Sequence, residues 1–177
     1  FSLVVWGPLA PGPFALDDLV RDLGAIAAAH ITRIGAAPFA RYTFVLMLTA
    51  DGYGGLEHGN SSINLFHPQA LTSRKHYEGL LELLSHELFH AWNGKRIAPA
   101  PLLAFDYGRE AYTRSLWLME GLTSHYDRWG LRDARVITAK SCLDKVLDAW
   151  SRLVAVPGRL RHSLEDSSFD AWIKLYK

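Results

Sequence analysis

The spacing of hydrophobic and polar positions divides the 177-residue chain into a mixed first part and a helical second part. Apolar runs at residues 2–6 and 41–50 predict strands. The second run is so continuously apolar that we expect both its faces to be buried. Between them, residues 15–35 carry apolar side chains at helical spacing and predict a helix. Residues 56–67 predict a short edge strand, a loop and a further strand.

The second part of the chain has the spacing of long helices. We expect helices at residues 74–96, 112–129 (with Asp106 a candidate cap and Gly130 the end), 135–156 and from about 167 to 176. Mixed elements followed by helices predict an α+β fold. We expect residues 1–68 to form an N-terminal α/β lobe and residues 69–177 a helical lobe, with a cleft between them.

Composition and charge narrow the classes of partner. The 19 basic and 18 acidic residues nearly balance, so nothing indicates binding to nucleic acid or to an anionic membrane surface. No apolar run approaches the roughly 20 residues that span a bilayer. Cys142 is the single cysteine, which excludes an internal disulfide and a thiolate zinc cluster. A lone cysteine is compatible with cytoplasm and periplasm, and the oligomeric state is left open.

The segment HELFH at residues 86–90 is the strongest candidate for chemistry. Residues four apart lie on one face of a helix, so His86 and His90 can direct ring nitrogens at one metal ion. Glu87 lies beside that point, where a carboxylate can move the proton of an attacking water. The motif alone also allows two hydrogen-bonded core histidines, because so short a pattern arises by chance.

A catalytic zinc site usually has three protein ligands and one open position. Glu110, Glu120 and His125 are the downstream candidates for the third ligand. Glu120 lies among apolar residues, and a buried carboxylate requires a partner such as a cation. Glu110 is more simply interpreted as an acidic residue at the start of a helix. His125 is more simply interpreted as an ordinary surface or core histidine.

Several motifs in order make the chain similar to a known family. HELFHAWNGKRIAP, LWLMEGLTSHY, the upstream GYGGLEHGNSS and the final SFDAWIKLY resemble the glycyl aminopeptidase family of gluzincin metallopeptidases. The resemblance runs from about Tyr42 to the C-terminus. It implies a thermolysin-like (zincin) catalytic domain, Zn²⁺ ligands His86, His90 and Glu120, and Glu87 as catalytic base.

The same resemblance implies an aminopeptidase that removes the N-terminal residue from a peptide with a free N-terminus. The family preference implies that this residue is Gly or Ala. Glu57 would bind the substrate α-amine, and Gly54 and Gly55 would let the backbone approach the substrate closely. His58 either orients Glu57 or is exposed. An edge strand at this position is able to pair with a peptide.

Residues around the ligands are candidates for bracing them. Asn93 or Arg96 is expected to support the ligands. Ser124 either hydrogen-bonds to a ligand or has a surface or capping role. Lys95 is interpreted as a favourable charge at a helix end.

The family's oxyanion-stabilising tyrosine has no clear counterpart. Tyr107, Tyr112, Tyr126 and Tyr176 are the candidates, and we expect the residue to lie beyond Lys177. The chain is therefore expected to be a fragment, truncated on its C-terminal side. The alternatives are a zinc endopeptidase of the same fold and a non-catalytic peptide-binding or scaffold domain.

Overall fold

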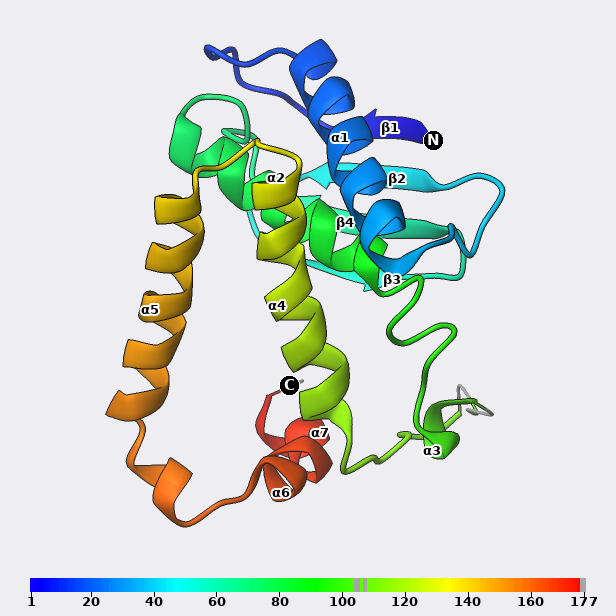
Figure 1. The fold of residues 1–177 in the computed structure, drawn as a ribbon, viewed down its shortest axis with the longest axis vertical. Helices are drawn as coiled ribbons and strands as arrows, with labels where there is room; N and C mark the ends of the chain where they lie inside the picture. The colour runs from blue at the N-terminus through cyan, green and yellow to red at the C-terminus, as the bar shows by residue number, and fades with distance from the viewer. Residues whose placement is uncertain (104–105, 107, 176–177) are drawn as a thin grey trace.

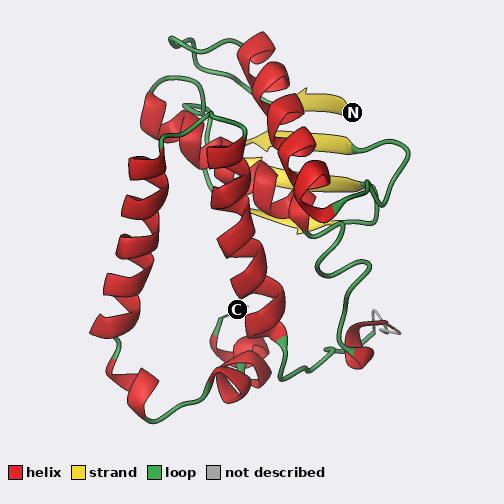
Figure 2. Cartoon of the chain, viewed as in Figure 1, coloured by secondary structure: helices red, strands yellow, loops and turns green. Residues whose placement is uncertain are grey.

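The computed structural model describes residues 1–103, 106 and 108–175, and it contains a four-stranded sheet at one side of the molecule (Figures 1 and 2). The strands are β1 (Ser2–Trp6), β2 (Thr43–Leu48), β3 (Gly54–Glu57) and β4 (Ser61–Phe66). Their order is β1-β2-β4-β3. The first three strands in this order are parallel, and β3 runs antiparallel to β4 at the edge.

Helices cover one face of the sheet and extend away from it. They are α1 (Leu16–Ile34), α2 (Arg74–Phe89), α3 (Ala100–Leu103), α4 (Leu116–Asp133), α5 (Ala139–Ala155), α6 (Leu164–Phe169) and α7 (Ala171–Lys174), with a 3₁₀ turn at Pro157–Leu160. The α+β arrangement with a small sheet agrees with the prediction. None of the described helices has the length and apolar character needed to cross a membrane.

One hydrophobic core joins the sheet to α1 and α2. Leu19, Leu23 and Ile26 of α1 are fully buried in this core, together with the alternate residues Phe44 and Leu46 of β2. The middle of α2 is part of the same core and is likewise buried. At roughly 1.5–3 kcal/mol for each large apolar side chain buried, this core fixes where α2 lies on the sheet.

The prediction that the run at residues 41–50 is buried on both faces was wrong. In β2 the side chains alternate between fully and partly buried, because α1 and α2 cover one face only. The neighbouring strands expose Val4, Trp6 and Ile63, with exposed fractions of 50%, 62% and 41%.

The predicted helix over residues 74–96 ends earlier, at Phe89, with His90 as its C-cap. Gly94 has a φ of +131°, in the region that favours glycine, and it turns the chain back toward His90. The side chain of Asn93 is held by α4, through its hydrogen bond to the Met119 carbonyl at 2.8 Å. The Gly94 turn and the Asn93 contact with α4 thus accompany an end of α2 well before Pro99.

The boundaries of the later helices also differ from the prediction. Asp106 caps no helix: its Oδ1 accepts a hydrogen bond from the Gly108 N–H, and α4 starts only at Leu116. Arg135 has a φ of +61° and lies outside α5, which begins after its cap, Thr138. The predicted C-terminal helix is divided at Asp170 into α6 and α7.

Gly130 does not end the second long helix, which continues to Asp133. A Cβ at Gly130 would overlap the His30 ring and approach Ser85. This glycine therefore lets α4 pass close to α1 and α2. The close passage brings the face of α4 that carries Glu120 over the end of α2.

Candidate metal centre

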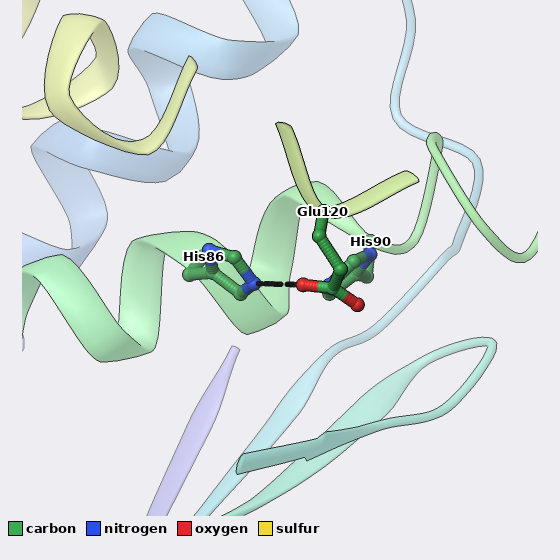
Figure 3. A group of neighbouring side chains, drawn as sticks. All are labelled: His86, His90 and Glu120. Atoms are coloured by element: carbon green, nitrogen blue, oxygen red, sulfur yellow. Dashed lines mark hydrogen bonds and ion pairs between the residues drawn. The ribbon is translucent and has the colours of Figure 1, made fainter. Parts of the chain in front are cut away.

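The end of α2 and the start of α4 bring three predicted ligands together (Figure 3). The Nε2 atoms of His86 and His90 are 3.1 Å apart. Glu120 Oε2 lies 3.2 Å from His86 Nε2 and 3.7 Å from His90 Nε2. One donor atom from each residue therefore lies within 4.8 Å of the other two.

The hydrogen bonds on the far side of each ring fit metal binding. His90 Nδ1 lies 2.8 Å from the Asn93 carbonyl oxygen, which only accepts, so Nδ1 carries the proton of a neutral ring. His86 Nδ1 lies 3.0 Å from Asp127 Oδ2. With Nδ1 donating in both rings, each Nε2 would offer a lone pair to a cation that displaces its own proton. Two lone pairs and a carboxylate oxygen at such distances fit a cation.

The electrostatics of the three residues point the same way. Burial would lower the pKa of His86, but hydrogen bonds with Asp127 and Glu120 outweigh it and raise this pKa to about 10. Burial would raise the pKa of Glu120, but its hydrogen bonds with the two histidines lower it to about 2. The surrounding carboxylates thus favour positive charge at this point.

Glu87 lies beside the three residues and is almost fully buried. Burial is the main reason why its pKa is raised to about 7. Its Oε2 has no hydrogen-bond partner among the described residues. The Tyr42 hydroxyl donates to the Glu87 backbone carbonyl at 3.0 Å and helps to fix this part of α2 against the sheet.

Strand β3 places Glu57 in the lining of a cavity that Glu87 also lines. This cavity has a volume of about 430 Å³ and contains Glu57, Glu87 and the three predicted ligands. Donor atoms of Glu57, Glu87 and His90 also lie within 4.8 Å of one another. His58 is exposed, and its backbone N–H bonds to the Ser61 carbonyl in the β3–β4 turn.

The two glycines before Glu57 have different roles. Gly55 lies directly over Glu87, since a Cβ there would overlap the Glu87 carboxylate. Gly54 has open space around it, but its φ of +142° favours glycine. The close backbone approach predicted at these residues thus occurs at Gly55, and toward the chain's own Glu87.

Asn93 connects the predicted ligands to α4. Its side chain donates hydrogen bonds to the Met119 carbonyl and to Thr123 Oγ1, at 2.8 Å and 3.0 Å. Thr123 Oγ1, rather than its neighbour Ser124, lies 3.4 Å from His90 Nδ1. Ser124 lines a neighbouring cavity of about 310 Å³ that also contains His86.

Asp127 lies at the site although it was not among the residues predicted from the sequence. It is 2% exposed and holds His86 through Nδ1. Its signal in the sequence was its position seven residues after Glu120, two turns along the same helix face.

The other candidates lie elsewhere. Glu110 is exposed, and His125 is exposed beside the rings of Tyr126 and Trp129. Tyr112 packs on Phe169, and Tyr126 stacks on Phe89. The remaining tyrosine candidates, Tyr107 and Tyr176, lie outside the described residues.

Comparison with known proteins identifies a class of peptidase. The family model of the M61 glycyl aminopeptidases matches residues 79–177. The chain therefore belongs to the M61 glycyl aminopeptidase family, as the sequence motifs predicted. Among solved structures, it is similar to an aminopeptidase N family protein from Idiomarina loihiensis, with a TM-score of 0.86 and 33% identity. The match covers 98% of this chain and 30% of that chain. A search of curated proteins gives no match.

Proposed function

We propose that this chain is the metal-binding part of a zinc aminopeptidase that removes the N-terminal residue of peptides. The observation that carries the proposal is the convergence of His86, His90 and Glu120 within 4.8 Å, in one cavity with Glu87 and Glu57. We propose a thermolysin-like catalytic domain with lobes at residues 1–68 and 69–177. Membership of a peptidase family supports peptides as substrates.

Two histidines and one carboxylate are a donor set suited to zinc. His86, His90 and Glu120 would hold the ion, with Asp127 and the Asn93 carbonyl orienting the two rings. Bound zinc would supply a Lewis acid that lowers the pKa of a water toward about 7 and polarises a carbonyl.

Glu87 is proposed to move protons. Its carboxylate is buried beside the predicted ligands, and its Oε2 has no protein partner among the described residues. It would accept the proton of the attacking water and deliver it to the departing amine.

Glu57 is proposed to bind the α-ammonium of the substrate. Glu57 lines the same cavity as the predicted ligands. A carboxylate at a fixed distance from the bound metal would place the scissile bond one residue from a free N-terminus. Strand β3 lies at the edge of the sheet, which leaves its outer side able to pair with an extended peptide. A small first residue, Gly or Ala, is inferred from the family alone.

The Glu87→Gln variant of the full-length protein tests the proposal. We expect kcat for an alanyl peptide to fall about 10²–10⁴-fold, the usual contribution of general acid–base catalysis. Zinc content should stay near one per chain, since Glu87 is not a proposed ligand. Glu78→Gln, on the same helix and paired with Arg74, is the matched control. Full activity of Glu87→Gln would refute the proposed role.

Two measurements separate the alternatives. An endopeptidase would cleave N-acetylated and free peptides at equal rates, whereas binding of the α-amine by Glu57 requires a strong preference for the free form. A scaffold domain would hold less than about 0.1 zinc per chain after metal-replete purification.

A further inference from the structure

Lys95 forms an ion pair with Glu57, the proposed amine-binding carboxylate. Its Nζ lies 3.1 Å from Glu57 Oε1, and the two side chains are 28% and 25% exposed. From the sequence, Lys95 is expected to be a favourable charge at a helix end. The structure instead pairs it with Glu57 of β3, 38 positions earlier in the chain.

The turn that carries Lys95 is tied to the end of α2. The Lys95 N–H donates to the His90 carbonyl at 3.1 Å, and the Gly94 N–H donates to the Ile97 carbonyl at 2.8 Å. A Cβ on Gly94 would lie 3.3 Å from His90 Nδ1, so the turn is packed on the ring itself. The backbone of Lys95 is therefore held in a fixed relation to His90.

The next residue extends the same connection. Arg96 Nη2 donates to the Pro38 carbonyl at 2.6 Å and contacts the Gly59 carbonyl at 3.4 Å. Gly59 lies in the turn between β3 and β4. Two successive basic residues thus connect the turn after α2 to the hairpin that presents Glu57.

Glu57 has a second set of neighbours that competes for its charge. Its carboxylate belongs to the group of Glu57, Glu87 and His90, whose donor atoms lie close enough to hold a cation. This group shares His90 with the three proposed ligands. A Glu57 free to move toward His90 would add a carboxylate to the metal and would be lost for amine binding.

We propose that Lys95 is a positioning residue for amine recognition. Its ammonium holds one oxygen of Glu57, so that the other oxygen serves the α-ammonium of the substrate and the carboxylate stays out of the metal's ligand set. This inference rests on the proposed aminopeptidase function.

The test compares the Lys95→Met and Lys95→Arg variants of the full-length protein with the wild type. We expect Lys95→Met to raise KM for a free alanyl peptide about tenfold or more, as for the loss of a hydrogen bond to a charged group. kcat should change less than about twofold, because the residue acts on binding of the amine. Lys95→Arg should restore most of the KM, since it keeps the cation.

Two further readouts do not depend on turnover. Lys95→Met should weaken the binding of alaninamide by the same factor while leaving N-acetylalaninamide unaffected. The visible absorption spectrum of the cobalt-substituted protein should also change, because Glu57 would then approach the metal. Lys140→Met removes an exposed ion pair with Asp144 on α5, and this control should change none of these values.

Other outcomes overturn the inference. A lower KM in Lys95→Met would mean that the lysine competes with the substrate amine. Unchanged KM and alaninamide affinity, or a fall in kcat alone, would also exclude the positioning role. If the wild type binds zinc without turnover, alaninamide affinity and the cobalt spectrum decide the inference. Absence of both zinc binding and turnover in the wild type would refute the proposed function itself.

Discussion

At the scale of single residues, Gly55 leaves the room that the Glu87 carboxylate occupies. The strand β3 passes so near to α2 that any side chain at position 55 would overlap the Glu87 carboxylate. Glu87 Oε2 has no hydrogen-bond partner among the described residues that would keep it in place. The absence of a side chain at Gly55 is therefore part of what sets the position of the proposed base.

We expect Gly55→Ala to lower kcat about 100-fold, because a displacement of a catalytic group by about 1 Å can have this effect. The added methyl group would push Glu87 away from the predicted ligands, while the three ligands themselves are untouched. Zinc content should therefore stay near that of the wild type. Gly121→Ala, where a Cβ meets nothing within 4 Å, is the control and should keep full activity. A Gly55→Ala variant with wild-type kcat would contradict the prediction. It would mean that Glu87 is not the proton carrier, or that β3 moves to accommodate the methyl group without displacing Glu87.

At the scale of elements, the pairing of α2 with α4 assembles the candidate centre. His86 and His90 come from the end of α2, whereas Glu120, Thr123 and Asp127 repeat along one face of α4. The hydrogen bond of His86 with Asp127 crosses between the two helices. The same contact joins the two helices and orients one of the proposed ligands.

We expect Asp127→Asn to weaken zinc binding about 10–100-fold, the usual effect of removing a carboxylate that orients a metal-bound histidine. The amide keeps the volume of the side chain but removes its charge, so the fold should be preserved. Competition with a coloured chelator measures the change in affinity. Asp148→Asn, exposed on α5, is the control. Equal zinc affinity in Asp127→Asn and wild type would rule out this role of Asp127.

At the scale of the whole molecule, His30 lies where α1, α2 and α4 meet. It is 0% exposed, and its Nε2 lies 2.8 Å from Ser85 Oγ, which in turn donates to the Asp127 carbonyl at 3.1 Å. Burial, with a further contribution from Arg33, lowers the pKa of His30 from 6.5 to about 4, against the opposing effect of Asp133. The contact between the three helices therefore requires a neutral ring.

This arrangement predicts acid sensitivity of the fold. Between pH 6.5 and about pH 4 the unfolded state binds a proton on His30 that the folded state does not bind. The free energy of unfolding therefore falls as the pH falls through this window, by about 3 kcal/mol for this residue at pH 4. Denaturant titrations should show a correspondingly smaller loss from pH 7 to pH 4 in His30→Gln. The exposed control His125→Gln should follow the wild type, and parallel curves for all three proteins would contradict the prediction.

Particular residues show how far the sequence could predict this molecule. The helix over residues 15–35 was predicted almost to the residue, because its apolar spacing is regular and Gly35, with a φ of +103°, ends it locally. The end of α2 was misplaced because residues 90–96 have no local signal against a helix except Gly94. At this end of α2, Asn93 hydrogen-bonds to α4, a contact between two elements that no local pattern contains.

The sequence by itself determined the α+β class, the order of elements and membership of the M61 glycyl aminopeptidase family, because periodicity and separate motifs are local properties of the chain. It also predicted His86, Glu87, His90, Glu120 and Glu57 as candidates, which the structure brings into one cavity. Only the tertiary structure decided that Asp127 holds His86, that Gly55 lies over Glu87 and that Lys95 pairs with Glu57. Each of these contacts joins residues from different elements, so it depends on how the core places the helices on the sheet.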